Sequence, residues 1–231
     1  MSPDSEQTVV PSSSAPAKGN AHDGALSLEG VRVAREPKVV PSSSAPAKGN
    51  AHDGALSLEG ISVAREPTEV SDEDRRTLRT QLGREARGVV EIAARCVCGR
   101  PLVVKTAPRL PDGAPFPTTF YLTHPQASSA IGTLEAGGVM AEMAARLASD
   151  GALAEAYRAA HLDYLARRAE LGAVPEIADI SAGGMPTRVK CLHALAAHAL
   201  AAGPGVNPLG DETLLRLAPH WRPDRCVCAD R

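Results

Sequence analysis

The stretch Gly88–Thr106, GVVEIAARCVCGRPLVVKT, decides the expected fold of this chain. Two runs rich in β-branched residues, Gly88–Arg95 and Pro101–Thr106, flank a short Cys-x-Cys-Gly-Arg connection. This pattern is typical of two strands joined by a tight turn. We therefore predict a β-hairpin, and Thr118–Thr123 (TTFYLT) is the third strand of the expected sheet.

Helical patterns lie on both sides of these strands. Ser71, followed by three acidic residues, predicts a helix N-terminus, and Gly83 is placed to end that helix. After the strands, apolar residues recur at helical spacing in two stripes: Val139, Met140, Met143 and Leu147, then Leu153, Tyr157, Ala160 and Tyr164. A last long helix is expected from Pro186 to about Ala202. The order predicts an α+β domain, with a small antiparallel sheet of about three strands and four to five helices.

A duplicated segment precedes this domain. Residues 9–37 recur at residues 39–67 with only two substitutions. Near-identical copies that open with a Pro/Ser/Ala/Lys/Gly run are typical of an unstructured chain. We expect a disordered tail over residues 1–67, one globular domain over residues 68–222 and a C-terminal tail over residues 223–231.

The composition excludes several classes of protein. The chain has 25 basic and 27 acidic residues and a net charge of −2, so no global field attracts nucleic acid or anionic lipid. No apolar run is long enough to cross a membrane, and the N-terminal residues lack a signal-peptide pattern. Five cysteines fit reduced thiols better than a disulfide scaffold. We expect a cytoplasmic protein that binds neither nucleic acid nor membrane.

Cysteine and histidine side chains provide one candidate site, for zinc or iron. Cys96 and Cys98 can reach the same side of an extended chain, as two ligands of a soft metal do. In a regular helix Cys191 and His193 would point about 200° apart, so only a late-starting helix would let both bind one ion. The candidate ligands are Cys96, Cys98, His124, Cys191 and His193, and a second Cys-x-Cys follows at residues 226–228. Buried packing cysteines and a hydrogen-bonded histidine are the alternative.

A glycine pair ahead of the last expected helix provides the other candidate. Gly183 and Gly184 would leave free backbone N–H groups at the positive end of the helix dipole, which favours an anion. The basic residues that would complete a phosphate or carboxylate site are Arg188, Lys190, Arg109 and Lys105. The alternative is an ordinary glycine-rich connection with solvated basic side chains.

The sequence specifies no catalytic residues. Cys191 with His193 or His198 has the residue types of a thiol–imidazole pair, but no third group that would orient them is evident. Three hypotheses follow. The preferred one is a module that binds a small anion; the others are a metal- or thiol-dependent enzyme and a partner-binding protein.

Two long strings carry a family resemblance: RCVCGRPLVVKTAPRLPDGAPFPTTFYLTHP (Arg95–Pro125) and SAGGMPTRVKCLHALAAHALAAGPGVNPLGDE (Ser181–Glu212). They resemble the bacterial family known as domain of unknown function 501, which is common in actinobacteria. The resemblance covers about Glu73 to Leu217 and implies a cytoplasmic bacterial protein of unassigned biochemistry. Members are often encoded near a septum-formation initiator and an exopolyphosphatase, which implies a partner linked to cell division.

Overall fold

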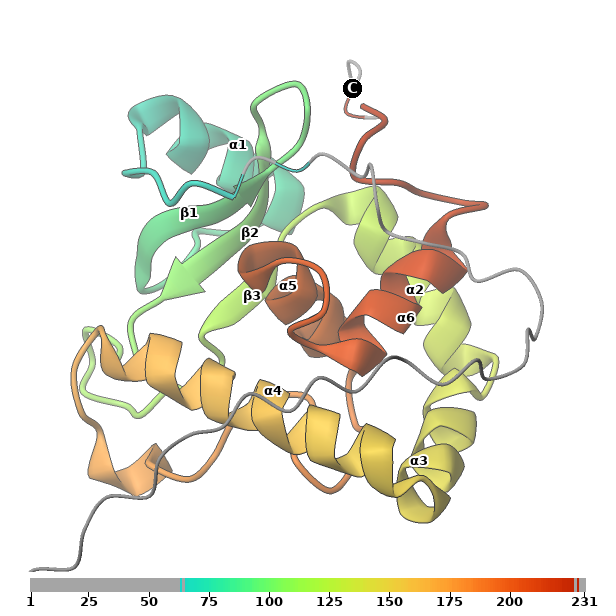
Figure 1. Ribbon diagram of the computed structural model, residues 1–231. Coiled ribbons are helices and arrows are strands. Elements are labelled where there is room, and N and C mark those ends of the chain that lie inside the picture. Colours follow the sequence, from blue (N-terminus) through green and yellow to red (C-terminus); the bar gives the residue numbers. More distant parts are fainter. Residues whose placement is uncertain (1–62, 64, 227, 229–231) are drawn as a thin grey trace, which may run out of the picture. The chain divides into compact units, whose positions relative to one another are not determined.

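A three-stranded antiparallel sheet is built around the predicted hairpin in the computed structural model, which describes residues 63, 65–226 and 228 (Figure 1). Strand β1 (Val89–Arg95) pairs with β2 (Pro101–Thr106), and β2 pairs with the short β3 (Phe120–Leu122). The hairpin turn closes where the Gly99 N–H donates to the Cys96 carbonyl at 2.8 Å. Gly99 has φ +86°, a conformation that glycine adopts without steric cost. The predicted sheet is confirmed.

The described part of the chain contains six α-helices, against the four to five expected. Their bounds are α1 Asp72–Leu82, α2 Pro125–Ala136, α3 Val139–Ser149, α4 Gly151–Ala169, α5 Leu192–Ala202 and α6 Pro208–Leu217, with a short 3-10 helix, η1, at Pro175–Ile177. The predicted α+β class is confirmed. The predicted stripes fall on α3 and α4, and α1 begins and ends as expected, with a capping box between Ser71 and Asp74 and with Gly83 at φ +67°.

Helices cover both faces of the sheet. On one face Leu78 of α1 packs with Ile92 and Val104 in a small apolar cluster. The larger core lies on the other face, where α5 packs against all three strands (Figure 1). Helix α6 packs closely on α5, because Gly210 presents no side chain to the Leu195 carbonyl. Helix α5 is therefore the central element of the core.

The predicted start of this central helix is wrong, because α5 begins at Leu192 rather than at Pro186. The backbone between these residues turns back on itself. The Arg188 N–H donates to the Gly184 carbonyl at 2.9 Å, and the Lys190 N–H donates to the Gly183 carbonyl at 2.7 Å. Cys191 then takes an extended conformation, with φ −157° and ψ 108°, as the N-cap residue. The glycine pair forms a closed loop and does not lead directly into the helix.

Packed residues extend past both expected edges of the domain. Val63 is buried in the core, and the Arg65 side chain donates to the Leu200 carbonyl at 3.2 Å, so the last residues of the second repeat copy belong to the domain. Near the other end, Pro223 is buried and Cys228 contacts Cys96. These contacts involve residues on either side of the predicted limits of 68 and 222.

Most of the duplicated segment, and the disorder predicted for it, lies outside the described residues. The chain divides into two units, Met1–Ala51 and His52–Arg231, and every described residue lies in the second. Across residues 63, 65–226 and 228, no helix combines the length and apolar character that a bilayer crossing requires.

Candidate metal centres

The two Cys-x-Cys pairs meet at the hairpin turn. The sulfur atoms of all four cysteines, Cys96, Cys98, Cys226 and Cys228, lie within 4.8 Å of one another. The sulfurs of Cys96 and Cys228 are 3.6 Å apart. We call this set the four-cysteine cluster. Cys96 is buried beneath the turn, whereas Cys98 and Cys226 are exposed and line a pocket of about 600 Å³.

The thiols of the four-cysteine cluster influence one another's ionisation. Burial raises the pKa of Cys96. Burial also acts to raise the pKa of Cys98, but hydrogen bonds from the Arg100 backbone and from the neighbouring thiols outweigh it and bring this pKa down to about 7. Burial and the two sulfurs of Cys96 and Cys98 raise the pKa of Cys228. One thiolate therefore forms readily, and further thiolates need a cation to offset their mutual repulsion.

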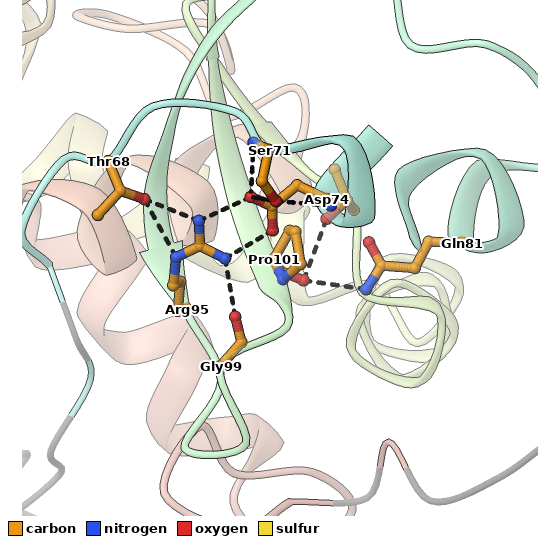
Figure 2. A network of polar contacts seen from close by, with 8 residues as sticks. Thr68, Ser71, Asp74, Gln81, Arg95, Gly99 and Pro101 are labelled. Carbon is orange, nitrogen blue, oxygen red and sulfur yellow. Dashed lines mark hydrogen bonds and ion pairs between the residues drawn. The ribbon is translucent and has the colours of Figure 1, made fainter. Parts of the chain in front are cut away.

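Arg95 holds the turn that carries Cys96 and Cys98 through the Gly99 carbonyl (Figure 2). Its guanidinium donates to the Gly99 carbonyl at 2.8 Å and to both oxygens of the Asp74 carboxylate at 2.7 and 3.0 Å. It also donates to the Thr68 hydroxyl. The Arg95 hydrogen bonds lower the pKa of Asp74 to about 2. This charge-assisted network fixes the position of the turn relative to α1 before any ion binds.

His124, a predicted ligand, lies beside the four-cysteine cluster. Its Nε2 atom is 3.2 Å from the Cys228 sulfur, and its Nδ1 atom accepts the Ala127 N–H at the start of α2. Burial lowers the pKa of His124 to about 4, so the ring is neutral at pH 7. Because Nδ1 is an acceptor, the single ring proton belongs on Nε2 and is donated to the sulfur. His124 therefore supports a cysteine from outside the set of four sulfurs.

The other two predicted ligands belong to a second group at the start of α5. Donor atoms of Glu135, Cys191 and His193 lie within 4.8 Å of one another. Because α5 begins at Leu192, Cys191 stands outside the helix, and the angular separation expected in a regular helix does not apply. We call this set the Glu135 cluster. The five predicted ligands are thus divided between two places.

The Glu135 carboxylate organises this second group. One oxygen accepts the Leu192 N–H at 2.7 Å and lies 3.2 Å from Nδ1 of His193. The other ring nitrogen of His193 is 3.1 Å from the Ser128 carbonyl. A hydrogen bond with Cys191 has the largest effect on the pKa of His193, and together with Glu135 and Ser128 it outweighs burial and raises this pKa to about 9.

The glycine loop of the predicted anion site makes its hydrogen bonds internally. The N–H groups of Arg188 and Lys190 bind the two glycine carbonyls, and the side chains of both residues are exposed. A Cβ atom at Gly184 would lie 2.7 Å from the Arg188 carbonyl oxygen, so only glycine fits this loop. The N-terminus of α5 does receive an anionic group, as helix dipoles favour, but that group is the carboxylate of Glu135.

The remaining predicted anion-binding residues are paired with carboxylates. The Lys105 amine lies 2.8 Å from Glu170 and 3.4 Å from Glu91. The Arg109 guanidinium donates to both oxygens of Glu176 at 2.7 and 2.8 Å. An added anion would have to compete with these pairs. Anion binding by this chain stays a prediction.

Three members of the two clusters were not in the predicted ligand set: Cys226, Cys228 and Glu135. Cys226 and Cys228 carried a usable signal, because they repeat the Cys-x-Cys spacing of the hairpin, but their distance along the chain gave no reason to join the pairs. Glu135 carried no usable signal, because it lies on α2, a helix that the apolar pattern of the sequence did not predict. Only Ala127 and Ile131 of α2 are buried.

Comparisons with known proteins place the chain in a family. Searches of curated proteins and of solved structures found no match. A family model described as "Protein of unknown function (DUF501)" matches residues 92–215, more than half of the chain. The match includes the whole Glu135 cluster and the hairpin cysteines, whereas Cys226 and Cys228 lie beyond it. The resemblance expected from the sequence is confirmed, and the chain belongs to the DUF501 family.

Proposed function

We propose that this protein binds one zinc ion at the four-cysteine cluster and that the ion fastens the C-terminal segment to the β1–β2 hairpin. The observation that carries the proposal is the convergence of four sulfur atoms to within 4.8 Å. Four thiolates are a recurrent ligand set of structural zinc sites, and they leave no coordination position open.

The spacing of the sulfurs suits a single ion. A tetrahedral zinc ion with Zn–S bonds of about 2.3 Å places its sulfur ligands about 3.8 Å apart. The separation of 3.6 Å between the sulfurs of Cys96 and Cys228 is close to that value. An iron–sulfur cluster with several irons would hold its cysteine sulfurs farther apart than a single ion does. Of the two ions that four thiolates commonly bind singly, zinc is bound more tightly than ferrous iron.

The surroundings favour thiolates at this place. The His124 Nε2–H donates to the Cys228 sulfur, and the Arg95 network holds the hairpin turn. Partners of this kind orient metal ligands and raise affinity. The ion would join residues 132 positions apart. Closing so long a loop removes much of the freedom of the unfolded chain, which is worth about 4–5 kcal/mol for a covalent link across a comparable loop.

The test is the metal content and ligand set of the full chain, purified without oxygen and examined by elemental mass spectrometry and zinc X-ray absorption. For the zinc ion at the four-cysteine cluster we expect a shell of four sulfurs at about 2.3 Å. A Cys226→Ser/Cys228→Ser variant should bind one zinc equivalent per chain fewer than the wild type. Its X-ray absorption should no longer show the four-sulfur shell. A Cys191→Ser variant is the matched control, because it removes the fifth cysteine and should keep the four-sulfur shell.

Three results would overturn the proposal. One is equal zinc content in the wild type and the Cys226→Ser/Cys228→Ser variant. Another is iron in place of zinc with the same four sulfurs. The third is a purified protein whose four cysteines are joined as two disulfides, detected as a mass lower by about four hydrogens.

A further inference from the structure

We propose that Glu135, Cys191 and His193 form a second metal site, which binds one divalent cation of the zinc type and keeps a coordination position open to the pocket beside β3. This site is separate from the four-cysteine cluster and does not depend on it. The argument rests on the donor geometry, the partner of His193 and the pocket.

The donor geometry fits a tetrahedral ion. A carboxylate oxygen, a thiol sulfur and an imidazole nitrogen are all within 4.8 Å of one another. The Glu135 oxygen and Nδ1 of His193 are 3.2 Å apart. Two such donors bound to one zinc ion at 2.0–2.1 Å would be about 3.3 Å apart. One thiolate and one carboxylate also balance the charge of a divalent cation, so the loaded site would be neutral.

The carboxylate is held ready by the start of α5. The Leu192 N–H donates to the same Glu135 oxygen that faces His193, at 2.7 Å. This bond fixes the carboxylate against the N-terminus of the helix while its remaining lone pairs stay available to a cation. The late start of α5 then brings Cys191 and His193 within reach of that carboxylate.

The second nitrogen of His193 has the partner that metal-bound histidines usually have. Its Nε2 atom lies 3.1 Å from the Ser128 carbonyl. A histidine that binds a metal through one nitrogen almost always donates the other N–H to a carbonyl or carboxylate, which fixes the ring.

The site opens on a pocket of about 490 Å³. Cys191 and His193 line this pocket together with Gly183, and its other walls include Phe120 and Leu122 of β3. Three protein ligands with a fourth position open is the arrangement of catalytic rather than structural zinc. The apolar walls suit a small uncharged molecule that binds the ion through one oxygen donor, such as a carbonyl group, or a water in its place.

The first test follows Cys191 alone and therefore does not depend on the four-cysteine cluster. Full-length protein is treated with iodoacetamide with and without added zinc, and each cysteine is read separately by peptide mass spectrometry. We expect zinc to slow alkylation of Cys191 at least tenfold in the wild type. Protection should be lost in Glu135→Gln, whose amide oxygen still accepts the Leu192 N–H and preserves the fold. Equal alkylation of Cys191 with and without zinc would overturn the proposal.

A matched control and a second readout separate a metal site from an ion pair. Ser128→Ala keeps the carbonyl that faces His193, so it should retain the protection. Cobalt-loaded wild type should change its visible spectrum on addition of azide, because the open position accepts a small anion, and Cys191→Ser should not respond. A closed four-thiolate site gives no azide response. No azide response in the wild type would contradict an open coordination position.

Discussion

The sulfur atoms of Cys96 and Cys228 lie 3.6 Å apart although the two residues are separated by 132 positions in the chain. One belongs to the hairpin turn between β1 and β2, and the other lies close to the C-terminus. Their contact, together with that of Cys98 and Cys226, makes the C-terminal segment part of the folded domain. The domain therefore gains a long-range connection at its β1–β2 hairpin turn.

Removing the metal should destabilise the domain. We expect a strong chelator to lower the midpoint of thermal unfolding of the wild type by roughly 10 °C, because about 4 kcal/mol of loop constraint is lost and each kcal/mol shifts the midpoint by about 2–4 °C at this size. The chelator should have a much smaller effect on the Cys226→Ser/Cys228→Ser variant, which lacks the four-cysteine site and already unfolds at a lower temperature. Calorimetry of both proteins checks this, and a chelator effect of equal size in the variant would contradict it.

The sequence predicts the parts of this fold that rest on local signals. The hairpin, α1 and the stripes of α3 and α4 depend on strand propensity, capping and helical spacing, all of which act over a few residues. Helix α6 had local signals too, since Asn207 caps it and Pro208 opens it. It went unpredicted because the preceding Gly203–Gly205 was taken only as the end of α5.

The arrangement of the candidate sites could not be predicted in the same way. The start of α5 is set by the closed loop of Gly183 and Gly184 and by the Glu135 carboxylate that receives the Leu192 N–H. The loop is local and the Glu135 bond is a tertiary contact, and together they override the helix-start signal of Pro186. The sequence therefore supplied the right residue types, and the packing of α2 against α5 decided which of them meet.

His124 should strengthen zinc binding without being a ligand. In His124→Phe the ring is kept against Trp221, whose centroid is 5.4 Å away, but the N–H that is donated to the Cys228 sulfur is lost. We expect zinc affinity to fall 10- to 100-fold with unchanged stoichiometry. Competition with a chromogenic chelator measures this. His161→Phe in α4 is the control and should leave the affinity unchanged, whereas loss of the full zinc equivalent in His124→Phe would make His124 a ligand.

Asp74 should make the domain sensitive to acid. Its pKa is lowered from 3.8 to about 2, chiefly by the Arg95 hydrogen bonds. The ionised carboxylate therefore stabilises the folded state fully at pH values above 3.8. This contribution, about 2 kcal/mol, is lost as the pH falls from about 4 to about 2. The difference in unfolding free energy between wild type and Asp74→Asn should therefore be largest near pH 6 and vanish near pH 2.

The exposed Asp72 in the same helical turn is the control for this difference. Asp72→Asn removes a carboxylate from the positive end of α1 but leaves the Arg95 network intact, so it should cost only about 0.5 kcal/mol. Denaturant titrations of the three proteins at a series of pH values give the comparison. If the difference in unfolding free energy between wild type and Asp74→Asn stayed constant down to pH 2, the charge of the Asp74 carboxylate would not be its cause.

Gly210 should be among the residues least tolerant of change, because α6 contacts α5 through it. A Cβ atom at this position would lie 2.3 Å from the Leu195 carbonyl oxygen and 2.8 Å from the Ala199 Cβ. Since the first obstacle is backbone of the buried central helix, Gly210→Ala must push the two helices apart. We expect it to lower the free energy of unfolding by about 3 kcal/mol or more, measured by urea denaturation.

Gly132 in α2 provides the matched comparison for Gly210→Ala. It is also helical, but a Cβ atom there meets nothing within 4 Å. Gly132→Ala should therefore stabilise the domain by up to about 1 kcal/mol, because alanine restricts the unfolded chain and favours the helix. The two substitutions add the same methyl group to the same kind of backbone, so their opposite signs would isolate the close approach of α5 and α6. Equal effects of the two substitutions would mean that these helices do not meet at Gly210.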